Sequence, residues 1–96
     1  METTWFFYIV LCRDGSYYSG VTNDLKRRIS QHNSGSGAKY TSGRRPVTLV
    51  YTEAHINAGE AIKREYQVKR WPRMKKEHLI NGLAGGPGTV ITSFDY

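Results

Sequence analysis

The feature that most constrains the fold is an uncharged run of eight residues from Trp5 to Cys12, built from aromatic and aliphatic side chains and one cysteine. A helix that crosses a bilayer needs roughly 20 apolar residues, so this run is too short to span a membrane. It is followed by Arg13-Asp14-Gly15-Ser16, in which Asp-Gly is a strong hairpin-turn signal. We therefore predict a buried strand from Trp5 to Cys12 that turns back into a second strand from Tyr17 to Val21.

The rest of the chain predicts three helices and one more strand. The predicted elements are a helix from Asp24 to about Asn33, a loop rich in glycine, serine and basic residues from Ser34 to Pro46, a strand from Val47 to Thr52, a helix from Ala58 to Trp71, and a helix from Pro72 to about Asn81. Thr22 or Asn23 can cap the first helix, Gly35 and Gly37 end it, and Asn57 can cap the second. The order β-β-α-β-α-α implies an α/β (α+β) domain with a small three-stranded sheet flanked by helices.

The length of 96 residues allows a single domain, for which we expect residues 1–81. Residues 82–96 begin with Gly-Leu-Ala-Gly-Gly-Pro-Gly and predict a flexible C-terminal tail in preference to a late strand. Cys12 is the only cysteine, which excludes an intrachain disulfide and a multi-thiolate metal site. The N-terminus lacks the features of a secretory signal, so we expect a cytoplasmic location without a membrane partner.

The charge of the chain points to an anionic partner. The 14 basic residues exceed the 8 acidic ones, which gives a net charge of +6. Between Leu25 and Thr52 there are basic residues and no Asp or Glu, and a second basic cluster runs from Lys63 to Lys76. A phosphate backbone is the natural counterpart of such a field. A solvated basic surface without a ligand fits the charge alone equally well.

Two polar residues lie beside the predicted apolar stripe of the first helix. Leu25 and Ile29 are four residues apart and mark the face that meets the sheet. Arg28 and His32 share that flank, whereas Lys26 and Arg27 are expected to point more toward solvent. Arg28 is thereby singled out for a role at the core edge, although a snorkelling arginine and a capping or edge histidine would show the same spacing.

A carboxylate occupies the predicted core face of the second helix. The apolar stripe of this helix is expected to comprise Ala58, Ala61, Ile62 and Val68. Glu65 lies between them, and an inward charge costs several kcal/mol unless it is paired or binds a metal. Its partner is expected to be Arg28, Lys69 or a divalent cation. Mg²⁺ commonly binds one or two carboxylates together with water and substrate phosphate, so phosphoryl chemistry fits a lone carboxylate.

Tyrosines gather on the predicted hairpin. Tyr8 lies on the first strand, and Tyr17 and Tyr18 lie on the second. Gly20 removes a side chain at the end of that strand, where backbone and ligand can approach closely. Phenols beside an arginine can position water at a phosphate, although cross-strand packing of aromatic rings explains a single tyrosine as well.

These residues together resemble the GIY-YIG nuclease superfamily. The motifs are Tyr8, Tyr18-Ser19-Gly20-Val21-Thr22, Leu25-x-x-Arg28, His32-Asn33 and the inward Glu65. The closest similarity is to the small single-domain bacterial branch, through Asp-Gly-Ser-Tyr-Tyr, Thr-Asn-Asp-Leu and Gly-Ala-Lys-Tyr-Thr followed by Gly-Arg-Arg-Pro. The similarity covers about 66 of the 96 residues, from Trp5 to Arg70. The tripeptides read Phe6-Phe7-Tyr8 and Tyr18-Ser19-Gly20, so the first lacks the family's Gly and Ile.

The resemblance implies a role for each matching residue. Tyr8 and Tyr18 correspond to the tripeptide tyrosines, one of which positions or deprotonates the attacking water. Arg28 corresponds to the arginine that stabilises the phosphate, and Glu65 to the glutamate that holds one divalent metal, Mg²⁺ or Mn²⁺. His32 falls at a position that often completes the catalytic site. The residues expected to bind nucleic acid are Arg27, Lys39, Arg44 and Arg45 on the backbone, with Tyr40 or Trp71 stacking on an unpaired base.

The expected function is therefore that of a divalent-metal-dependent endonuclease acting on DNA rather than RNA, in DNA repair or processing. The chain has no room for an additional recognition domain, so specificity is expected to be low or supplied by a partner protein. The alternatives are a basic nucleic-acid-binding module that retains the nuclease fold without hydrolysis, and a basic scaffold protein. The binding module is expected to show salt-sensitive binding without a metal-dependent product. The scaffold protein is expected to show neither cleavage activity nor a steep dependence of binding on salt.

Overall fold

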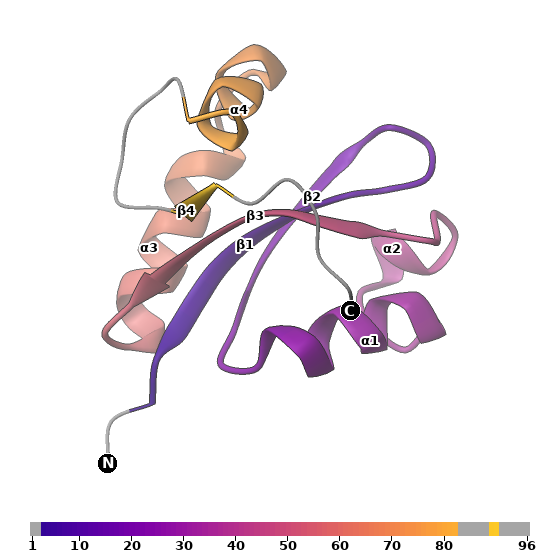
Figure 1. The fold of residues 1–96 in the computed structure, drawn as a ribbon, viewed down its shortest axis with the longest axis horizontal. Helices are drawn as coiled ribbons and strands as arrows, with labels where there is room; N and C mark the ends of the chain where they lie inside the picture. The colour runs from indigo at the N-terminus through magenta and orange to yellow at the C-terminus, as the bar shows by residue number, and fades with distance from the viewer. Residues whose placement is uncertain (1–2, 83–88, 91–96) are drawn as a thin grey trace.

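A twisted antiparallel sheet forms the centre of the molecule (Figure 1). The computed structural model describes residues 3–82 and 89–90. The elements are β1 (Trp5–Leu11), β2 (Tyr17–Thr22), α1 (Leu25–Ser34), α2 (Lys39–Ser42), β3 (Thr48–His55), α3 (Ala58–Lys69), α4 (Arg73–Ile80) and β4 (Thr89–Val90). The strands are ordered β2-β1-β3-β4, so β1 lies between β2 and β3. The predicted three-stranded sheet and its flanking helices are confirmed.

The positions of three elements differ from the sequence prediction. α2 lies inside the predicted loop. The sequence did not predict this helix, because four residues between glycines are too few to show a helical periodicity. β3 continues through Glu53 to His55, whereas the predicted strand ended at Thr52. β4 pairs Val90 with Tyr51 and lies in the expected tail, of which residues 83–88 and 91–96 fall outside the described part of the chain.

A β-bulge in β3 divides the core between the two faces of the sheet. Leu49 pairs with Val10 and Tyr51 pairs with Ile9, so Val50 is the extra residue between them. The bulge directs Leu49 to one face and Tyr51 to the other. The first face packs on α1 and comprises Tyr8, Val10, Cys12, Ile29, Val47 and Leu49. The second face packs on α3 and α4 and comprises Phe7, Ile9, Tyr51, Val68 and Leu79 (Figure 1).

Helix caps fix where the site-bearing helices begin. Asp24 itself caps α1, since its carboxylate accepts a hydrogen bond from the backbone N–H of Arg27 at 3.1 Å. The prediction that Thr22 or Asn23 would do so is wrong, because the Thr22 hydroxyl instead accepts from the N–H of Asp24 at 3.1 Å. Gly35 ends α1 with φ 90°, which favours glycine. The predicted cap of α3 by Asn57 is confirmed.

The inward face of α3 is rotated from the predicted stripe. Ala61 and Val68 are buried as expected, but Ile62 is 44% exposed. Arg64 and Glu65 are half-buried instead, because Arg64 reaches a carboxylate on β3. Among the described residues no helix is both long and apolar enough to cross a membrane.

That carboxylate, Glu53, is buried beneath α3 and is 2% exposed. It accepts hydrogen bonds from Arg64 Nε at 2.8 Å and from the Tyr51 hydroxyl at 2.6 Å, and it lies 2.9 Å from His55 Nε2. A buried charge with this many partners is tolerated because its lost hydration is replaced by hydrogen bonds. The pair with Arg64 therefore joins β3 to α3.

Replacing Glu53 by alanine should lower the free energy of unfolding by about 3–5 kcal/mol, because the Arg64 guanidinium is left without its buried partner. Urea denaturation measures the change. Glu60→Ala is the matched control, since Glu60 is exposed and its pair with Lys63 at 3.5 Å should contribute less than about 1 kcal/mol. Equal effects of the two substitutions would contradict a structural role for the Glu53 pair.

Candidate active site

A chain of buried hydrogen bonds runs from β1 through α1 to α2. The Tyr8 hydroxyl lies 2.8 Å from His32 Nε2, and His32 Nδ1 lies 2.8 Å from Thr41 Oγ1. Thr41 donates its own hydroxyl proton to the Ala38 carbonyl at 3.0 Å. Thr41 must therefore accept from His32 Nδ1–H, which leaves Nε2 unprotonated to accept the proton of the Tyr8 hydroxyl.

Burial keeps both members of the Tyr8–His32 pair neutral. Both side chains are 0% exposed. Burial raises the pKa of Tyr8 to about 12, against the opposing effect of Arg28. Burial, and then the charge of Arg28, lower the pKa of His32 to about 4. At neutral pH the phenol thus keeps its proton and the imidazole is uncharged.

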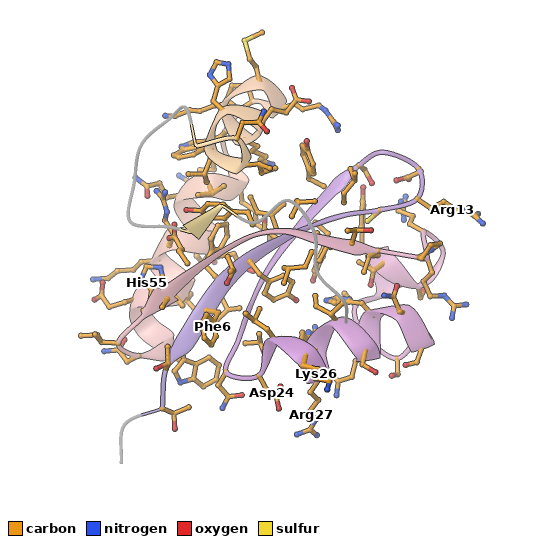
Figure 2. The ribbon with its side chains drawn as sticks, in the orientation of Figure 1. Phe6, Arg13, Asp24, Lys26, Arg27 and His55 are labelled. Atoms are coloured by element: carbon orange, nitrogen blue, oxygen red, sulfur yellow. The ribbon has the colours of Figure 1, made fainter. Side chains whose placement is uncertain are left out.

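Arg28 approaches this pair from α1. Its Nε donates to the Tyr8 oxygen at 3.3 Å, and its Nη1 donates to Gln31 Oε1 at 3.3 Å. The side chain is half-buried and lines a cavity of about 280 Å³ together with Trp5 and Arg27. Lys26 and Arg27 point away from the sheet (Figure 2). The prediction that Arg28 differs from Lys26 in facing the core edge agrees with this placement.

Tyr18, on β2, lies beside His32 of α1. The two rings make an edge contact with their centroids 5.5 Å apart. Tyr18 is half-buried, in contrast to Tyr8. Two glycines make room for the cluster: a Cβ on Gly20 would collide with the Tyr8 hydroxyl, and one on Gly37 would collide with the His32 ring. The structure therefore brings Tyr8, Tyr18 and His32 together.

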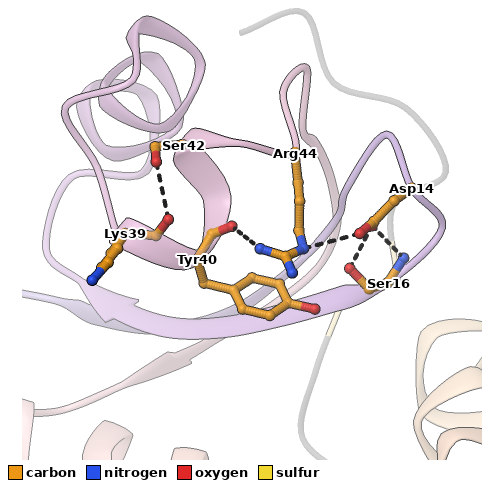
Figure 3. A network of polar contacts seen from close by, with 6 residues as sticks. All are labelled: Asp14, Ser16, Lys39, Tyr40, Ser42 and Arg44. Carbon is orange, nitrogen blue, oxygen red and sulfur yellow. Dashed lines mark hydrogen bonds and ion pairs between the residues drawn. The ribbon is translucent and has the colours of Figure 1, made fainter.

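Arg44 holds the outer side of this cluster. Its guanidinium lies 3.9 Å from the centroid of the Tyr40 ring, which stacks with Tyr18 at 5.8 Å. Figure 3 shows Arg44 donating to the Tyr40 carbonyl at 2.8 Å and to Asp14 at 2.9 Å. Hydrogen bonds from Ser16, and then Arg44, lower the pKa of Asp14. Arg44 and Tyr40, predicted to contact nucleic acid, are thus already engaged with protein groups.

Glu65, on α3, has a carboxylate that is unengaged in the part of the chain that the structure describes. It is half-buried, and its charge contributes to raising the pKa of Tyr8. Over residues 3–82 it forms neither a hydrogen bond nor an ion pair, so the pairings considered with Arg28 and Lys69 are not formed. Among the described residues, no three or more His, Cys, Asp or Glu side chains are grouped so that they could hold a metal ion. A lone carboxylate with open oxygen positions fits Mg²⁺ or Mn²⁺ supplemented by water and phosphate.

The other predicted nucleic-acid contacts are divided between the faces. Arg27, Lys39 and Arg45 are exposed on the α1 and α2 side. Trp71 packs against the hydrophobic core on the other face of the sheet, under α3 and α4. Lys75 Nζ lies 4.2 Å from the centroid of its ring. The structure therefore does not bring Trp71 to the Tyr8 cluster.

Three residues that support the Tyr8, Tyr18 and His32 cluster were not predicted from the sequence. Thr41 fixes the His32 tautomer, Gly37 makes room for the imidazole, and Asp14 neutralises Arg44. Thr41 and Gly37 fall in the stretch interpreted as a loop. A signal for Asp14 was its position in the Asp-Gly turn, but its contact with Arg44 is 30 residues away in sequence.

Comparisons with known proteins give one family model and several similar proteins. A model described as the GIY-YIG catalytic domain matches residues 4–78. A UPF0213 protein of Halobacterium salinarum is 51% identical over 76% of this chain and 95% of its own length, and one of Bacillus pumilus is 53% identical over 81% and 80%. Among solved structures, the UPF0213 protein from Bacillus halodurans is 49% identical over 85% of this chain and 87% of its own, with a TM-score of 0.54. A protein from E. faecalis is 44% identical over 84% and 88%, with a TM-score of 0.58.

The neutral state of His32 makes stability depend on pH. Its pKa is about 4 in the folded protein, below the ordinary 6.5, so the unfolded chain binds more protons between these values. The stabilisation should be complete above pH 6.5 and be lost as pH falls through 4, a change of about 3 kcal/mol. Urea unfolding from pH 7 to pH 4 measures it. His32→Gln should reduce this pH dependence and the exposed His78→Gln should not; identical profiles for wild type and His32→Gln would contradict the assignment.

Proposed function

Because the chain belongs to the GIY-YIG family, whose catalytic-domain model covers residues 4–78, we propose that it is an endonuclease that hydrolyses phosphodiester bonds with a divalent metal ion. One observation carries this proposal. A guanidinium, Arg28, is bonded to a buried neutral phenol, with the unengaged carboxylate of Glu65 within electrostatic range of the same phenol. Phosphoryl transfer needs a fixed cation and a metal ligand in one place.

Arg28 is proposed to stabilise the charge that accumulates on phosphorus. Its Nε is held by Tyr8 and its Nη1 by Gln31, so the guanidinium is oriented before a substrate arrives. Two of its five N–H groups make these bonds, which leaves others to donate to phosphate oxygens. Donors that are fixed in advance contribute most because they need no reorganisation during the reaction.

The two tyrosines are proposed to have different roles. Tyr8 is 0% exposed, and its hydroxyl already bonds to His32 and Arg28. It therefore acts through Arg28 as a positioning residue, with His32 holding its proton in place. Tyr18 is half-buried and is the phenol that can contact the attacking water. The water oxygen bonds to phosphorus while the bond from phosphorus to the leaving sugar oxygen breaks, and the proton that the water loses is balanced by the proton that the leaving oxygen gains.

Glu65 is proposed to hold the metal ion, which supplies Lewis-acid stabilisation of the leaving oxygen when bound. The exposed side chains of Arg27, Lys39 and Arg45 are proposed to contact the nucleic-acid backbone. The family resemblance favours DNA as the substrate, in repair or processing, and a cytoplasmic location is proposed with it. Substrate specificity is proposed to be low or to be supplied by a partner protein.

Arg28→Ala and Glu65→Gln should each reduce cleavage by about tenfold to a thousandfold, because each removes a group that stabilises transition-state charge. The measurement is cleavage of labelled single-stranded, duplex and branched DNA, and of RNA, with Mg²⁺ or Mn²⁺. Lys26→Ala and Glu60→Gln are matched controls on the same helices, and both residues are exposed. Cleavage at the parental rate by both site variants would refute the assignment of the site.

A chelator should abolish cleavage by the wild-type protein while leaving salt-sensitive binding to nucleic acid intact. Binding without any metal-dependent product on all four substrates would instead favour the alternative, a basic module that retains the nuclease fold. The acid-free segment from Leu25 to Thr52 is the observation that supports this alternative. The cleavage assay, together with a measurement of nucleic-acid binding at several salt concentrations, separates the two functions.

A further inference from the structure

A second cationic cavity lies beyond the candidate active site, where the C-terminal end of α1 meets the β1–β2 turn. Its volume is about 490 Å³, and it is lined by Arg13, Asn33, Ser42, Gly43, Arg45 and Pro46. None of these side chains belongs to the Tyr8 cluster, and Arg13 was not among the residues predicted from sequence to bind nucleic acid. Its lining contains two guanidinium groups and no carboxylate.

The walls of this cavity are tied together by hydrogen bonds. The backbone N–H of Arg13 donates to the Arg44 carbonyl at 2.9 Å, which joins the hairpin turn to the segment after α2. The Asn33 side chain accepts from the Val47 N–H at 2.7 Å and donates to the Val47 carbonyl at 3.1 Å. The cavity is therefore formed by fixed backbone and not by side chains alone.

Arg45 is oriented before any ligand binds. Its Nε donates to the Ser42 carbonyl at 2.8 Å and its Nη1 to the Asn33 carbonyl at 3.5 Å. These bonds place the positive charge of Arg45 against the C-terminal carbonyls of α1. There the charge also interacts favourably with the negative end of the helix dipole. Of the five N–H donors of a guanidinium, three remain for an anion.

Arg13 supplies the second charge. It is exposed at the end of the hairpin (Figure 2), and over residues 3–82 its side chain makes no hydrogen bond or ion pair. The adjacent acid, Asp14, is engaged by Arg44 and Ser16. The positive potential of Arg13 and Arg45 is therefore not cancelled by an ion pair of their own.

We propose that this cavity binds a backbone phosphate of the nucleic acid, on the strand that carries the phosphate held by Arg28. The inference rests on the proposed nuclease function and assigns Arg13 a role in positioning the substrate. Arg28 and Asn33 are five residues apart on α1, a rise of about 7.5 Å. A strand carries one phosphate per about 3.4 Å of helix axis, so a phosphate a few nucleotides from the scissile one can reach the cavity.

The test is the salt dependence of DNA binding, measured by fluorescence anisotropy of a labelled duplex in the presence of a chelator so that no cleavage occurs. Arg13→Gln should reduce the slope of log K against log salt by about 0.9, the value for one lost phosphate contact. Arg13→Lys should retain the slope because it retains the charge. Arg70→Gln is the matched control, since Arg70 is exposed on the far side of the sheet, at the end of α3, and should leave the slope unchanged.

An unchanged slope for Arg13→Gln, or an equal reduction for Arg70→Gln, would overturn the proposal. Titration of isotope-labelled wild-type protein with inorganic phosphate gives a second readout that needs no variant. It should shift the amide resonances of Ser42 and Gly43, and shifts confined to other residues would argue against the cavity. Neither readout uses catalysis, so loss of the nuclease proposal in the cleavage assay is distinguishable from loss of this one.

Discussion

The buried chain Tyr8–His32–Thr41 is the interaction on which the rest of the site depends. Three polar side chains lie inside an apolar core, and each has a hydrogen-bond partner there, so the cost of burying them is offset. The chain requires glycine at positions 20 and 37, because a Cβ at either would meet the phenol or the imidazole. It also fixes the direction in which the Tyr8 oxygen accepts, and thereby the position of Arg28.

Acidic residues determine which cations remain available on this basic protein. Asp14 engages Arg44 at the surface, and Glu53 engages Arg64 beneath α3. Both arginines then serve structure, since one stacks on the Tyr40 ring and the other joins α3 to β3. The basic segment after Leu25 consequently presents a smaller and more localised set of charges than its sequence indicates, with Arg28 at one cavity and Arg45 at another.

Much of this arrangement was predictable because it follows local rules. The apolar run, the Asp-Gly turn and the helical spacing of Leu25, Arg28 and Ile29 predicted the hairpin, the order of elements and the arginine at the core edge. The rest depends on contacts between distant segments. The burial of Glu53 depends on Arg64, and the exposure of Ile62 follows from the rotation of α3 that this pair imposes. The hydrogen bond from His32 to Thr41 depends on α2, which places Thr41. Four residues are too few to show a helical periodicity, so this bond could not be predicted from the sequence.

The roles proposed for Arg28 and Glu65 require that the two side chains do not pair with each other. An ion pair between them would occupy the arginine and the carboxylate together, so neither would be available to substrate or metal. Arg28 instead donates to a phenol whose pKa is raised to about 12 by burial. A tyrosinate at that position would compete with phosphate for the guanidinium, whereas a neutral hydroxyl accepts one hydrogen bond and leaves the positive charge uncompensated. Burial of Tyr8 thus keeps the charge of Arg28 available for an anion.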